Sequence, residues 1–156
     1  MLRILLIATL GLSIGQTAWS KPKVAETITH YEISGVTATE LRAQMKAKGP
    51  NGYWGFSSWY VRWTGSCKLS VTVDITMPKL KNPENIPSNL VQKFDKMYAA
   101  LLTHEKNHGQ HAISAAEEIE ANRCKNGNAI IDKWAAEDAA YDRRTNHGET
   151  EGVVLY

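Results

Sequence analysis

The stretch that decides the fold is residues 88–124, SNLVQKFDKMYAALLTHEKNHGQHAISAAEEIEANRC. Its large apolar side chains recur every three or four positions, which is the spacing of one face of an α-helix. They are Leu90, Phe94, Met97 and Leu101, and the same face continues through His104, His108, His111 and Ala115. Ser88 or Asn89 can cap the start of this helix, and Asn126-Gly127 can end it. We predict one long helix whose buried face changes from apolar residues to histidines.

The histidine half of this face contains the motif His104-Glu105-Lys106-Asn107-His108. Residues four apart project from the same side of a helix at about 6 Å, so His104 and His108 can hold one metal ion between them. Glu105 is offset from that line, too far to be a ligand but near enough to accept a proton from the attacking water. This arrangement predicts a Zn²⁺ cofactor with Glu105 as the general base. The alternative is a pair of histidines bonded to core carbonyls or water.

A zinc hydrolase site normally has three protein ligands, so one more must come from elsewhere in the chain. His111 lies seven residues past His104, about 10 Å along the helix axis, which is too far for both to converge on one ion. We predict His147, in a turn-like tail after the last helix, as the third metal ligand. His30 and Asp142 are the alternatives that the sequence leaves open.

The rest of the chain predicts three strands and two further helices. The strands are residues 27–33, 57–63 and 67–77. The first helix follows a capping box at Thr37 and Glu40 and ends at Gly49-Pro50. The last helix contains Ile130, Trp134 and Tyr141. Residues 64–66 form the turn of a hairpin, and Pro78 is expected to end the third strand. The fold prediction is α+β: a small antiparallel sheet packed on the long metal-binding helix plus a C-terminal helix, with a zincin-like site.

Residues 1–20 have the features of a secretory signal peptide: Arg3, then an apolar stretch, then the small-residue cleavage pattern Ala18-Trp19-Ser20. An uncleaved N-terminal anchor is the alternative. Residues 21–156 then form a single secreted or periplasmic domain, with no membrane association after signal cleavage. Because exported cysteines are more often paired than free, we predict a Cys67–Cys124 disulfide. The net charge is only +2, which gives no indication of a nucleic-acid partner.

Several motifs together resemble the bacterial family called domain of unknown function 922, which is described as predicted secreted zinc-dependent proteases. They are Tyr31-Glu32-Ile33-Ser34-Gly35, Gly49-Pro50, Trp59 with Trp63, Cys67, Leu101-x-x-His104-Glu105-x-x-His108, and Tyr141-Asp142-x-x-Thr145-x-His147-Gly148. The resemblance covers nearly all of the chain after residue 20. It implies that His104, Glu105, His108 and His147 belong together. Glu151 is a departure, because Gln commonly precedes the final glycine.

The predicted function is a secreted zinc metallopeptidase acting on a peptide or protein substrate. Tyr141 is the predicted hydrogen-bond donor to the oxyanion, and core packing is its alternative role. Trp59 and Trp63 are expected in the core, whereas the aromatic residues near position 55 could instead line a substrate groove. The rival functions are a non-catalytic exported zinc-binding protein and a cell-wall peptide amidase. Glu105 separates the first rival from an enzyme, because metal binding alone does not require it.

Overall fold

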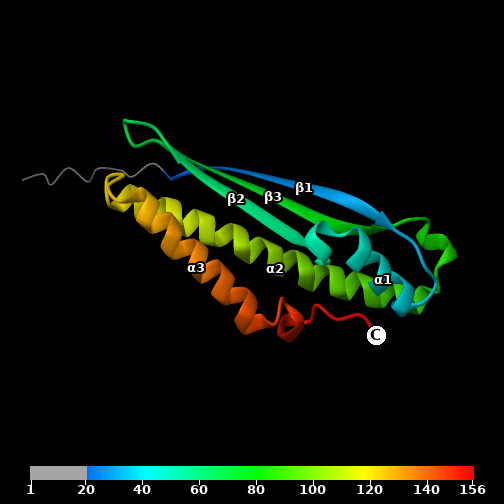
Figure 1. Ribbon diagram of the computed structural model, residues 1–156. Coiled ribbons are helices and arrows are strands. Elements are labelled where there is room, and N and C mark those ends of the chain that lie inside the picture. The colour runs from blue at the N-terminus through cyan, green and yellow to red at the C-terminus, as the bar shows by residue number, and fades with distance from the viewer. Residues whose placement is uncertain (1–20) are drawn as a thin grey trace, which may run out of the picture.

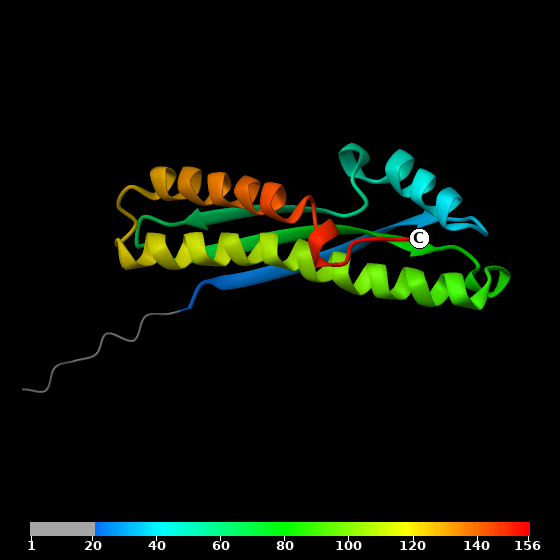
Figure 2. The same cartoon turned by 90° about the horizontal axis from the view of Figure 1, so that it is seen from below.

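The computed structural model describes residues 21–156, so the predicted signal peptide lies outside the described residues. A three-stranded sheet covers two long helices that run beneath it (Figure 1). The strands are β1 (Lys23–Ile33), β2 (Phe56–Trp63) and β3 (Leu69–Leu80), and the helices are α1 (Ala38–Lys48), α2 (Ser88–Ala121) and α3 (Gly127–Thr145). In the view from below, α2 and α3 lie side by side along the sheet (Figure 2). The predicted α+β fold class is confirmed.

The sheet is mixed, so the prediction of an antiparallel sheet was wrong for one strand. β3 is central, with β2 antiparallel on one side and β1 parallel on the other. The chain reverses once through α1, between β1 and β2, and a second time at the hairpin that joins β2 to β3. β3 therefore runs in the same direction as β1 and lies between the two earlier strands. The alternation of residues predicts which face is buried, but it carries no information on strand direction.

β3 continues through Pro78 to Leu80, so the predicted end of the strand at Pro78 was also wrong. The pairing with β2 stops at Phe56 and Thr76, whereas the pairing with β1 continues to Ile33 and Leu80. At Pro78 the strand therefore has a neighbour on one side only. Proline is tolerated at such an edge because its missing N–H removes no bond on the open side.

The core lies between the sheet and α2. The buried side chains of β3 are Val71, Val73, Ile75 and Met77, and those of α2 include Leu90, Phe94, Met97 and Leu101. α2 approaches β3 closely at Gly109, where an added Cβ would lie 2.9 Å from Cγ1 of Val73. This contact accounts for a glycine inside a long helix, where it otherwise costs about 1 kcal/mol relative to alanine.

The helix ends follow the predictions in part. Thr37 accepts a hydrogen bond from the backbone N–H of Glu40, and Glu40 accepts from the backbone of Thr37, which is the predicted capping box. α2 differs, because its N-cap is Pro87 and Ser88 is already helical, so neither Ser88 nor Asn89 is the cap. Proline has the fixed backbone angle that suits a helix start, and no side-chain cap is formed there.

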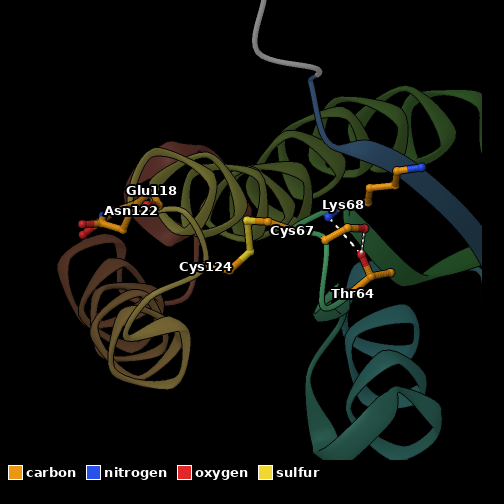
Figure 3. Close-up of a disulfide and its surroundings, with 7 residues drawn as sticks. Thr64, Cys67, Lys68, Glu118, Asn122 and Cys124 are labelled. Atoms are coloured by element: carbon orange, nitrogen blue, oxygen red, sulfur yellow. Dashed lines mark hydrogen bonds between the residues drawn. A yellow bond between two sulfur atoms is a disulfide. The ribbon is translucent and has the colours of Figure 1, made fainter. Parts of the chain in front are cut away.

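The predicted disulfide is present between Cys67 and Cys124, with Cα atoms 5.7 Å apart. It joins the turn between β2 and β3 to the connection between α2 and α3 (Figure 3). Two segments that are 57 residues apart in sequence are thereby fixed at one end of the molecule. Within residues 21–156, no helix has the length and apolar character needed to cross a membrane.

Candidate metal centre

Three potential metal ligands from two helices meet below the sheet. Nε2 of His104 lies 3.2 Å from Nε2 of His108, and Oδ1 of Asp142 lies 3.1 and 3.2 Å from these two nitrogens. Both histidines are buried on α2, at 3% and 7% exposure, and Asp142 projects from α3. The three atoms form a nearly equilateral triangle.

The size of this triangle fits a zinc ion. Zinc binds histidine nitrogen at about 2.0–2.1 Å and carboxylate oxygen at similar distances, so tetrahedral ligands lie about 3.3 Å from one another. The observed edges of 3.1–3.2 Å are close to that value. A fourth position would remain open, as in catalytic rather than structural zinc sites. His104, His108 and Asp142 could therefore hold a metal ion.

The second nitrogen of each histidine is bonded to a carboxylate. Nδ1 of His104 lies 2.8 Å from Oε2 of Glu151, and Nδ1 of His108 lies 2.7 Å from Oδ1 of Asp138. A carboxylate can only accept, so each Nδ1 carries the proton and donates it. The Nε2 lone pairs of neutral histidines then face one another and Asp142. Three acceptors at this spacing favour a cation between them.

The carboxylates around His108 also favour a positive charge on or beside its ring. Burial alone lowers the pKa of His108, but the hydrogen bond and charge of Asp138, with the charges of Asp142 and Glu105, outweigh it and raise the pKa overall. A metal ion bound at Nε2 would compete with a proton for the same nitrogen, which would make metal binding dependent on pH.

Glu105 is buried beside this triangle and faces the same cleft. The residue is 4% exposed, and burial is the main reason that its pKa rises to about 7. His108 opposes this rise, and the nearby charges of Asp142 and Asp138 add to it. The beginning of β2 fixes the helix at this point, because Oγ of Ser57 donates to the backbone carbonyl of Glu105 at 3.0 Å. A carboxyl with this pKa can exchange protons near neutral pH.

The structure does not place His147 among the three converging ligand atoms. His147 lines the cleft with a half-exposed side chain, and its Nδ1 lies 3.4 Å from Oδ2 of Asp142. Asp142, an alternative that the sequence left open, supplies the third converging atom. His30 is placed elsewhere, on β1, where its Nε2 is 3.0 Å from the hydroxyl of Tyr98.

Tyr141 lies behind the histidines, and it is not one of the residues that line the cleft. Its ring stacks on His104 with centroids 4.9 Å apart. The hydroxyl accepts from Nδ2 of Asn107 and donates to Glu151, both at 2.8 Å. Burial is the main reason that the pKa of Tyr141 rises to about 12, so the proton stays on this oxygen. These contacts place the side chain where it can orient His104 through Glu151.

His111 is bonded to Asp138 rather than directed at the triangle, as its distance along the helix implies. Its Nδ1 lies 2.7 Å from Oδ1 of Asp138, the same oxygen that His108 uses. The other oxygen of Asp138 accepts from Nε1 of Trp59 at 3.3 Å. Burial opposes ionisation of Asp138, but the hydrogen bonds from His108 and His111 lower its pKa overall.

The candidate centre opens into a cleft of about 820 Å³ between the start of β2, the end of α3 and the C-terminal segment. The residues of its wall near β2 include Tyr53, Trp54 and Phe56, in agreement with the groove that the sequence allowed. Trp59 is partly buried and packs against the core, as expected, whereas Trp63 is partly buried beside Gly127 and lies outside the core cluster. A cleft of this size accommodates a short stretch of peptide.

Asp138 and Glu151 were missed as hydrogen-bond partners of His108 and His104. One signal existed for Asp138, because it precedes Asp142 by four residues and both therefore lie on one face of α3. For Glu151 the only signal was its departure from the family pattern. Its position in the tail gives no periodicity from which a contact with His104 could be predicted.

These features define an α+β protein with a candidate metal site between two helices, one of which carries His-Glu-x-x-His. The family model described as "Bacterial protein of unknown function (DUF922)" matches residues 28–148, and the chain belongs to this family. The match includes His104, Glu105, His108, Asp142 and His147 and ends before Glu151. No curated protein and no solved structure matched the chain.

Proposed function

We propose that this protein is an exported zinc-dependent peptidase. The observation that carries the proposal is the position of Glu105, buried at the edge of the triangle of His104, His108 and Asp142 and facing the same cleft. A site that only bound metal would need the three ligands and not this acid. The disulfide agrees with an oxidising compartment outside the cytoplasm, which supports export.

His104, His108 and Asp142 would hold the zinc ion in this proposal. Zinc bound there would polarise the substrate carbonyl and make water acidic enough to attack near neutral pH. Glu151 and Asp138 would orient the two histidines by accepting their Nδ1 protons. Burial of the two histidine rings would strengthen these bonds, although the carboxylates are partly exposed.

Glu105 would act as the proton carrier of the reaction. Its carboxylate would accept a proton from the attacking water and pass it to the amine that leaves when the peptide bond breaks. Burial raises the pKa of this carboxyl in the metal-free protein, and a bound zinc ion would oppose that rise, so the group could be deprotonated before attack and protonated after it. The aromatic wall formed by Tyr53, Trp54 and Phe56 would contact the substrate.

The test measures zinc content and cleavage in the same preparations. Mature protein, its Glu105→Gln variant and a His30→Ala control are analysed for bound metal and incubated with a broad peptide library. We expect one zinc per chain in all three proteins. Wild type and His30→Ala should cleave peptides, and a chelator should abolish this cleavage. Glu105→Gln should show no cleavage. Zinc in all three without cleavage by wild type would favour the non-catalytic zinc-binding protein, and cleavage of cell-wall peptides alone would favour the amidase.

A further inference from the structure

Two groups of side chains near the centre place three potential ligand atoms within 4.8 Å of one another, and they share His108. The first is the triangle with His104 and Asp142. The second consists of His108, His111 and Asp138. The contact distances distinguish the two groups. The first has edges of 3.1–3.2 Å, whereas in the second both Nδ1 atoms lie 2.7 Å from Oδ1 of Asp138.

A distance of 2.7 Å is that of a short hydrogen bond between a nitrogen and a carboxylate, and it is too short for two ligands of one zinc ion. His108 also cannot serve two ions as a neutral imidazole, because one of its nitrogens must keep the proton. The second group is therefore built of hydrogen bonds rather than of vacant ligand atoms.

We infer that Asp138 and His111 are positioning residues for His108, so that the third histidine of α2 acts on the metal centre without binding metal. The inference rests on the metal site of the proposed function. Asp138 Oδ1 accepts from His108 and thereby keeps the Nε2 lone pair of His108 directed toward His104 and Asp142. His111, about one turn further along α2, is hydrogen-bonded through its Nδ1 to the same oxygen.

Asp138 also joins three elements at this point. It projects from α3, accepts from two histidines of α2, and accepts from Trp59 of β2 through its other oxygen. Both of its oxygens therefore have donors, and its carboxylate has little freedom to turn. The ring of His111 packs at 6.0 Å from Trp134 and 5.5 Å from Tyr141, which limits its movement as well. A fixed acceptor gives His108 a fixed orientation.

The experiment measures zinc affinity by competition with a chelating dye and records the visible spectrum of the cobalt-substituted protein. The variants are Asp138→Asn, Asp138→Ala, His111→Phe and the double variant, with His30→Ala as the matched histidine control. Loss of a partner that orients a metal-binding histidine typically weakens metal binding about 10- to 100-fold. We expect losses in that range for Asp138→Ala, smaller losses for Asp138→Asn and His111→Phe, a changed cobalt spectrum, and no change for His30→Ala.

The double variant shows whether His111 acts on His108 through Asp138. If His111 acts through Asp138, then adding His111→Phe to Asp138→Ala causes no further loss of affinity. Additive losses, unchanged affinity in Asp138→Ala, or two zinc ions per wild-type chain would overturn the inference. Zinc binding as expected without any peptide cleavage would leave the inference standing and reject the proposed peptidase. Unfolding of the metal-free variants by urea excludes a general loss of fold, and Asp138→Asn preserves the shape of the side chain if Asp138→Ala does not fold.

Discussion

A methyl group added at Gly55 would lie 2.7 Å from Oε1 of Glu105 and 3.0 Å from Cδ1 of Leu101, so the start of β2 closes over the carboxylate with no room for a side chain. Gly55→Ala should therefore displace the Glu105 carboxylate. We expect kcat to fall by roughly tenfold, because small misplacements of a catalytic group have large effects on rate, while zinc affinity stays the same.

The control for Gly55→Ala is Gly65→Ala in the turn between β2 and β3, where an added Cβ meets nothing within 4 Å. Both variants add the same methyl group, so they are matched in chemistry and differ in surroundings. Equal kinetics for the two would show that Gly55 is not needed to seat the carboxylate.

The identity of the third ligand gives a second prediction. Asp142→Ala removes one vertex of the triangle, whereas His147→Ala removes a half-exposed side chain that lies near the other oxygen of Asp142 and against the ring of Tyr53. Loss of a ligand should weaken zinc binding by about 100-fold or more, above the range for residues that only orient a ligand, and His147→Ala should have less effect. Isothermal titration with zinc measures both. The opposite order of effects would return His147 to the third position.

The disulfide gives a third prediction, on stability. Its cysteines are 57 residues apart, and the chain-entropy relation assigns a loop of that length about 4 kcal/mol. Cys67→Ala combined with Cys124→Ala should lower the free energy of unfolding by roughly 2–4 kcal/mol, measured with urea. Reduction of the wild type should reproduce the same shift. A midpoint that moves with neither treatment would mean that the bridge does not restrict the unfolded chain.

The capping box of α1 gives a prediction with a pH dependence. Hydrogen bonds from the backbone N–H groups of Val36 and Thr37 lower the pKa of Glu40 below its usual value. A carboxyl with a lowered pKa stabilises the folded state above its unfolded pKa, and this contribution is lost as the pH falls through the folded pKa. Glu40→Gln should therefore be less stable than wild type at pH 7, and the difference should shrink toward pH 3.

The control for Glu40→Gln is Glu117→Gln, a change of the same charge at an exposed position of α2. Its effect on stability should be small and should not follow the same course with pH. A difference between Glu40→Gln and wild type that stays constant from pH 7 to pH 3 would contradict the role given to the carboxylate in the cap.

Much of the fold could be predicted because its signals are local. The three- and four-residue spacing of Leu90 to Leu101 predicts the buried face of α2, and the Thr37 and Glu40 spacing predicts the cap of α1. The disulfide followed from the number of cysteines and the expected compartment. The direction of β1 could not be predicted, because parallel and antiparallel strands bury the same alternate residues.

The site was harder to predict because its parts come from separate elements. The spacing of His104, Glu105 and His108 needs only one helix, so the sequence brings them together without tertiary information. The choice between Asp142 and His147 depends on how α3 is rotated about its axis against α2, which no local pattern determines. The turn-like tail after the last helix and the glycine after His147 favoured His147 in the sequence, although α3 turns Asp142 toward the histidines.

We propose that Glu105 performs proton transfer at a zinc site formed by two histidines of its own helix and Asp142 of α3. The most direct test is the single-turnover cleavage rate of zinc-loaded wild type and zinc-loaded Glu105→Gln, at equal zinc content, on a peptide found in the library screen. General acid–base catalysis contributes about 10²- to 10⁴-fold, so we predict a loss of that size with zinc affinity retained. Equal rates for the two proteins would contradict the account.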